Sequence, residues 1–287
     1  MAAEQDSAAG VELRDAVRGF SGGMLFGVPL LYTMEVWWVG GHTTPAQMLL
    51  VLAFTFAVVL ALNVTGGFRG RDDGTAAGIL QDSLEALAIG LVSSAVVLVV
   101  LQEIRPGVPL SVALGKVIYE AMPFAMGVSL ARHFLQGGRV DPDGEAGTEP
   151  ELASRVNATV ADLGAAAVGA IFVALNIAPT DEVPMLTAAM PPLWLIALVV
   201  LSLVSTYLIV FAAGFGDVDA RRQQQGVLQH PWTETLASYL VALVVAGVLL
   251  ALFQQFDDKD PWQDMLSQVV VLGLPASVGG AAGRLAV

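Results

Sequence analysis

The sequence predicts an all-α, polytopic membrane protein with eight transmembrane helices, arranged as two parallel four-helix repeats. Three observations predict this class. The chain is 55% apolar and only 14% charged over 287 residues, whereas soluble domains are roughly a quarter charged. It contains eight apolar runs of about the 20 residues that a helix needs to cross a bilayer. Finally, a stretch of the first half matches a stretch of the second half without a gap.

Each predicted span is an apolar run bounded by residues that end or restart helices. Pro and Gly mark several boundaries, among them Gly40-Gly41 with Pro45, and Pro106-Gly107. The predicted spans are 19–39, 46–67, 78–103, 109–134, 157–179, 191–215, 233–255 and 264–285.

The distribution of basic residues predicts the orientation. With eight spans, ten of the 13 Lys and Arg residues fall on one side, and only Arg105 and Lys259 fall on the other. Lys and Arg gather in cytoplasmic loops. We therefore expect both termini in the cytoplasm and the chain in the cytoplasmic membrane of a prokaryote.

The internal match predicts how the spans are grouped. Residues 81–132 align with 233–284, and 12 of the 52 positions are identical, including a Pro-x3-Gly-x4-Arg pattern that begins at Pro123 and Pro275. Each half holds an even number of spans, so both insert the same way up, as a parallel repeat. The predicted domains are a first repeat over 1–135, an acidic cytoplasmic loop over 136–155 and a second repeat over 156–287.

Composition excludes several functions. A net charge of -13 argues against nucleic acid, because phosphate binding needs a basic surface. The chain has no Cys, and its three His residues lie in or beside predicted loops without metal-ligand spacing. We therefore expect no enzyme, no cofactor and no metal site. The expected partners are the lipid bilayer and small cations or protons, and homo-oligomerisation stays open.

The strongest candidate site lies in the fourth span. Glu120 is near mid-membrane, where charge is costly and usually faces protein or water. Lys116 precedes it by one helical turn on the same face, so the two can pair, and Tyr119 adds a phenol nearby. One interpretation is a carboxylate that binds a proton or cation. The other is a structural ion pair that lets both charges enter the membrane.

Four further polar residues complete the predicted site, each with a plainer alternative. Glu35 lies toward the outer end of the first span, as a solvated carboxylate unless a kink at Pro29 turns it inward. Asp82 and Glu85 occupy the first turns of the third span, where acids favour the helix dipole. Asn63, near the end of the second span, is also typical of interhelical hydrogen bonding.

Residues 18–38 carry a resemblance. The pattern Tyr32-Thr33-Met34-Glu35 followed by Trp37-Trp38 resembles the first span of an uncharacterised family of bacterial integral membrane proteins. The family brings no activity with it. A weaker similarity joins Phe20-Ser21 to the Arg-x-x-x-Phe-Ser-Asp signature of the lysosomal-type potassium channel family, but here Gly22 replaces the Asp.

Two functions follow from these observations. The first is transport, by an ion channel or an ion-coupled carrier with Glu120, Lys116 and Glu35 in its pathway. The second is a non-transporting scaffold or sensor that presents loop 136–155 to a partner. An open polar cavity between the halves would favour transport, and a dry, packed interface would favour the scaffold.

Overall fold

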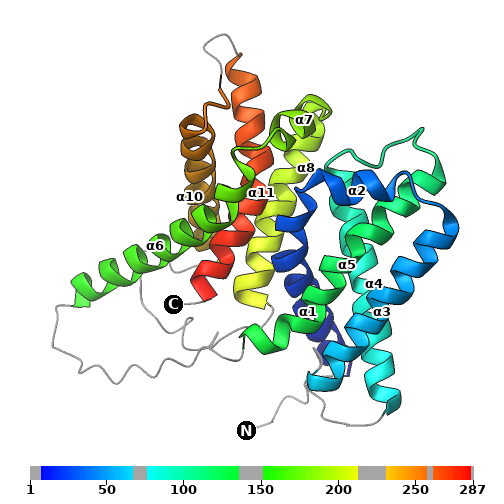
Figure 1. Cartoon of the computed structure of the whole chain (residues 1–287). Coiled ribbons are helices and arrows are strands. Elements are labelled where there is room, and N and C mark those ends of the chain that lie inside the picture. Colours follow the sequence, from blue (N-terminus) through cyan, green and yellow to red (C-terminus); the bar gives the residue numbers. More distant parts are fainter. Residues whose placement is uncertain (1–7, 67–75, 136–150, 213–230, 257–260, 286–287) are drawn as a thin grey trace, which may run out of the picture.

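The computed structural model describes residues 8–66, 76–135, 151–212, 231–256 and 261–285, and every regular element in these ranges is a helix (Figure 1). The helices are α1 (Ala8–Leu31), α2 (Met34–Gly40), α3 (Pro45–Gly66), α4 (Ala76–Val100), α5 (Leu110–Leu135), α6 (Glu151–Ile177), α7 (Glu182–Ala188), α8 (Pro192–Tyr207), the π-helix η1 (Leu208–Ala212), α10 (Pro231–Leu252) and α11 (Trp262–Leu285).

The predicted all-helical class is confirmed, and each of the eight predicted ranges contains a helix. Five helices are long and apolar enough to cross a membrane: α3, α4, α8 with η1, α10 and α11. The pair α6 and α7 is a sixth if its 85° bend is counted within one span. The described residues thus contain five or six candidate spans.

The first predicted span is not a single helix, which corrects the range 19–39. α1 ends at Leu31 and α2 begins at Met34. The break is made by Thr33, whose backbone N–H and hydroxyl both donate to the Leu30 carbonyl. The same device ends α6, where the N–H and hydroxyl of Thr180 donate to the Ile177 carbonyl at 3.0 and 2.6 Å. A short helix follows each break.

The helices form two groups, each packed around one helix. In the first group α5 packs against α1, α2, α3 and α4, and in the second α11 packs against α6, α7, α8 and α10. Glycine allows close approach at the main crossing of each group. A Cβ on Gly22 would lie 2.6 Å from the Gly127 carbonyl oxygen, and one on Gly279 would lie 2.5 Å from that of Gly169. The backbones therefore touch, and a larger residue would separate the helices.

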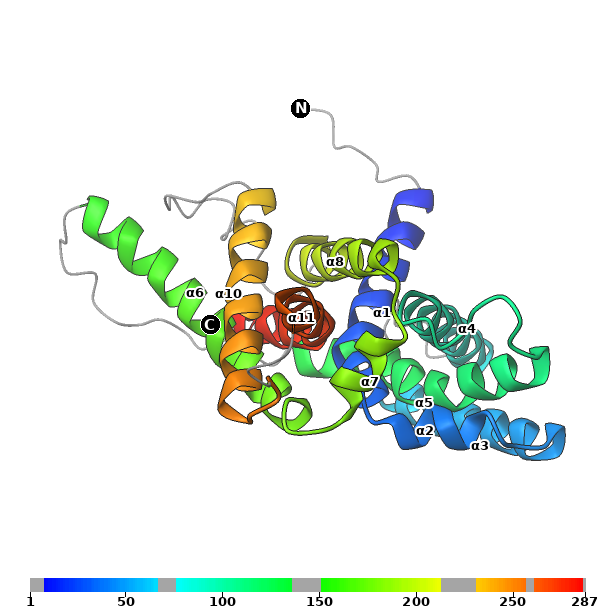
Figure 2. The same cartoon turned by 90° about the horizontal axis from the view of Figure 1, so that it is seen from above.

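The two groups meet along α1, which lies near the middle of the molecule (Figure 2). α1 packs against η1 and α11, and α4 touches α8. The Tyr32 hydroxyl donates to the Val271 carbonyl at 2.5 Å. The core cluster to which Tyr32 belongs includes the buried apolar side chains of Met24 and Val28 on α1 and Ile209 on η1, and the phenol of Tyr239 on α10 also lies close to Tyr32. This part of the interface is packed rather than open.

The range predicted as an acidic loop, 136–155, includes the start of α6. Its residues 136–150 lie outside the described residues. α6 begins at Glu151, so the last five residues assigned to the loop are helical.

Candidate functional site

Glu120 is the most unusual polar residue of the described core. It lies in the middle of α5 with 0% of its surface exposed, and among the described residues neither of its carboxylate oxygens has a hydrogen-bond partner. One turn further along α5, the Phe124 ring fills the space left by the missing side chain of Gly27 on α1. The close α1–α5 contact therefore shields this part of α5 from water.

Lys116 does not pair with Glu120, which corrects the predicted i, i+4 pair. Its Nζ donates to Glu103 Oε2 at 2.6 Å and to the Glu103 carbonyl at 3.2 Å. It also lies 4.6 Å from the centre of the Trp37 ring, where a cation is attracted to the aromatic face. The ammonium is held at the end of α5 that meets α2, one turn away from the buried acid.

Glu103 was not among the site residues predicted from the sequence. It follows α4 directly, in a turn where Gln102 adopts a left-handed φ of 63°. That turn returns the chain toward α5, which begins at Leu110. The sequence could have predicted this pair. Glu103 and Lys116 lie on either side of the short connection between α4 and α5, so both lie at the same end of the helix pair.

The other predicted residues do not join Glu120 in one site. Glu35 is exposed in the first turn of α2, so Pro29 does not turn it inward. Tyr119 is partly buried on α5. Asn63 is buried and donates to Ser83 at 3.1 Å, which ties α3 to α4. Glu35 and Asn63 therefore lie toward opposite ends of the first group, and Tyr119 is the neighbour of Glu120 on α5.

Asp82 and Glu85 lie at the end of α4 remote from Lys116. Both are partly buried, and Glu85 accepts a hydrogen bond from Gln81 at 3.0 Å. Ser94 of α4 donates to the Val117 carbonyl of α5 at 3.3 Å. Val117 is close to Glu120 in the chain, so Ser94 lies beside the buried part of α5. Nine residues of helix separate Glu85 from Ser94, which is about 13 Å. The two acids therefore lie well away from Glu120.

A second buried charge, Arg284, was predicted only as a cytoplasmic basic residue near the chain end. Its side chain is 0% exposed and forms ion pairs with Glu234 of α10 and, at 3.9 Å, Asp162 of α6. It also donates to the Ser238 hydroxyl at 3.1 Å. These contacts join three helices, and the two carboxylates compensate the charge of the buried guanidinium. The geometry is that of a structural ion pair that holds α6, α10 and α11 together.

Within the described residues no group of three or more His, Asp or Glu side chains could hold a metal ion. The arrangement that remains is a shielded carboxyl in α5, with the Lys116–Glu103 ion pair one turn away. Such a carboxyl can bind and release a proton, provided that water or a cation reaches it.

A comparison with protein families finds one that matches almost the whole chain. The family described as "Putative integral membrane protein (DUF2391)" matches residues 15–287. No curated protein and no solved structure matches the chain.

Proposed function

The chain belongs to this family of integral membrane proteins, and from that premise we propose that it is an ion-coupled transport protein in which Glu120 binds and releases a proton or small cation. The family resemblance inferred from residues 18–38 is confirmed, and a protein of this family sits in a lipid bilayer. The observation that carries the transport proposal is the burial of an acidic side chain without a partner among the described residues.

The proposed architecture is eight spans in two parallel four-helix repeats, with both termini in the cytoplasm. Local details that recur at fixed offsets support it. Gln102 and Gln254, 152 residues apart, are the non-glycine residues with positive φ in the described chain. Three successive N–H groups at each of these helix ends, those of residues 101–103 and 253–255, bond to carbonyls at equivalent positions. Thr33 and Thr180, 147 residues apart, break the two first helices in the same way.

The charges near Glu120 belong to one half only, which supports a role beyond folding. At the 152-residue offset, Glu120, Lys116 and Glu103 correspond to Leu272, Gln268 and Gln255. Leu272 is fully buried, like Glu120. The second half therefore builds the same helix crossing with an apolar residue at this position. Since the crossing does not need the acid, the cost of burying it favours a functional role.

In the proposed mechanism Lys116 pairs alternately with Glu103 and with Glu120. An ionised carboxylate without partners is very costly in an apolar interior, whereas a neutral carboxyl costs far less, so the described packing suits the protonated acid. When Glu120 releases its proton, its charge is one helical turn, about 6 Å of rise, from Lys116. Lys116 then exchanges Glu103 for Glu120, and Glu103 is freed toward the outer end of the bundle.

The test is proton flux in liposomes. Purified protein is reconstituted with a pH-sensitive dye inside, and a potassium diffusion potential drives proton entry. We expect flux above that of empty liposomes, its loss in Glu120→Gln and its partial retention in Glu120→Asp. Glu85→Gln, which removes a partly exposed carboxylate from the same half, is the matched control and should retain flux. Equal flux in Glu120→Gln and the unchanged chain would remove Glu120 from the pathway.

One observation favours the alternative, a non-transporting scaffold or sensor. The described interface between α1 and the second group is packed, mostly with apolar side chains, and Tyr32 is bonded across it. If transport occurs, its pathway therefore runs inside the first group rather than between the groups. No flux from well-folded protein would favour the scaffold, with the acidic segment before and at the start of α6, 136–155, as its partner-binding segment.

A further inference from the structure

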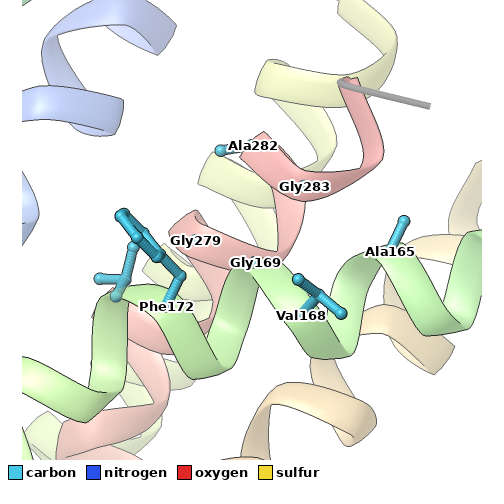
Figure 3. A pocket seen from close by; sticks show the side chains of 8 residues that line it. Ala165, Val168, Gly169, Phe172, Gly279, Ala282 and Gly283 are labelled. Carbon is cyan, nitrogen blue, oxygen red and sulfur yellow. The ribbon is translucent and has the colours of Figure 1, made fainter.

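We propose that α6 and α11 form a docking surface for a second copy of this chain. A groove of about 420 Å³ lies where the two helices cross (Figure 3). It is lined by Ala165, Gly169 and Phe172 of α6 and by Gly279 and Gly283 of α11. The inference rests on the repeat proposed above, because the first half shows what covers the equivalent groove.

In the first half the groove is filled by the chain itself. The positions equivalent to Gly169, Phe172, Gly279 and Gly283 are Gly22, Leu25, Gly127 and Ala131. Leu25 of α1 and Leu285, at the end of α11, both pack against the fully buried Ala131. The second half therefore covers the α1–α5 groove.

The exposed fractions along the two first helices differ accordingly. Met24 and Val28 on α1 are 0% exposed, whereas their equivalents on α6, Ile171 and Leu175, are 42% and 45% exposed. Phe172, in the groove itself, is 76% exposed. The face of α6 that corresponds to a buried face of α1 is thus open.

This difference is not general, because positions that face away from the bundle in both halves agree. Val92 on α4 is 63% exposed and its equivalent Val244 on α10 is 65%. Leu84 and Leu236 are 54% and 49% exposed. Equivalent lipid-facing positions are therefore equally open, and the α6 face departs from its counterpart because one contact is missing.

The surface that covers α1 also has an unused counterpart. On α11 this surface begins at Val271, the partner of Tyr32, and continues at helical spacing through Leu274 and Val278, which are almost fully buried. Their equivalents on α5, Met122 and Met126, remain partly exposed. Each chain therefore carries one open groove, on α6 and α11, and one open covering face, on α5. In a dimer, the α5 face of one copy would cover the α6–α11 groove of the other. The contact would resemble the one within the chain, where the α11 face lies on α1. An acyl chain would fill the groove but leave the covering face unexplained.

Cysteine cross-linking tests the contact, since the chain has no Cys of its own. The Tyr32–Val271 contact within the chain maps onto Pro179 of one copy and Tyr119 of the other. Pro179→Cys and Tyr119→Cys chains, with different tags, are co-expressed and treated in the membrane with a short bis-maleimide. We expect a doubly tagged dimer, at least tenfold more abundant than from Val244→Cys with Tyr119→Cys.

A second measurement keeps the result independent of the cross-linker. Chains fused to a fluorescent protein, at high dilution in liposomes, should bleach in two steps. Single-step bleaching, or cross-linking no greater than with Val244→Cys, overturns the proposal. The proposal is also overturned if oxygen dissolved in the membrane reaches a nitroxide at Phe172→Cys as readily as one at Val244→Cys. That result would show that lipid occupies the groove. A dimer without proton flux sinks only the transport proposal, and an active monomer sinks only this one.

Discussion

The buried arginine of α11 gives the sharpest test of how charge is held in this fold. Arg284 is 0% exposed, whereas its partners Glu234 and Asp162 are 23% and 31% exposed. Two single substitutions test this network, one that removes an acidic partner and one that removes the arginine. Glu234→Gln leaves the arginine buried, and Arg284→Met leaves carboxylates that water can reach. The two variants should therefore differ in stability.

The burial and the distances set the magnitudes. Removing one partner of a buried pair costs about 3 to 5 kcal/mol when the other charge stays buried. Asp162, at 3.9 Å, retains some compensation for Arg284, so Glu234→Gln should cost about 3 kcal/mol. Arg284→Met fills the site with an apolar side chain of similar length and leaves partly hydrated acids, so about 1 kcal/mol is expected. The double variant should also cost about 1 kcal/mol, because no charge is then buried alone.

The assay is unfolding in mixed micelles by increasing SDS, followed through the fluorescence of the five Trp residues. The double-mutant cycle should give a coupling energy of about 2 to 3 kcal/mol. Ser267→Ala, which removes an exposed hydroxyl bonded only within its own helix, is the control and should change little. If Arg284→Met is the more costly change, or if the two effects add, the closed-network account of Arg284 is wrong.

Three further predictions use the same preparations. Reporter fusions at the C-terminus and within 140–150 should both signal cytoplasm, and a periplasmic signal from either breaks the eight-span topology. Gly22→Ala should lower stability by about 1 to 3 kcal/mol, because its Cβ would lie 2.6 Å from a carbonyl oxygen of α5. Gly164→Ala, which meets nothing within 4 Å, should be neutral or stabilising. Lys116→Met and Glu103→Gln should show a coupling of at least about 0.5 kcal/mol, and additivity would contradict their pairing.

The helical class and the approximate limits of the helices could be predicted from the sequence, since they depend on local properties. A run of apolar residues of sufficient length favours a helix wherever it lies, and Pro or Gly ends it whatever its neighbours are. The gap-free match between the halves depends on local sequence too. It predicts that Pro123 and Pro275 occupy equivalent places, which stays a prediction; Pro123 lies inside α5 and Pro275 inside α11.

The partners of the charged side chains were decided only by the tertiary structure. Helical spacing placed Lys116 and Glu120 on one face, but it could not say which carboxylate the flexible lysine reaches. The turn after α4 brings Glu103 to Lys116, and the α1–α5 contact leaves Glu120 shielded. In the same way, the charge distribution predicted only that Arg284 lies on the cytoplasmic side, whereas the structure encloses it between α6 and α10. Pairing energies depend on distances across the bundle and on exclusion of water, which are set by packing between residues far apart in the chain.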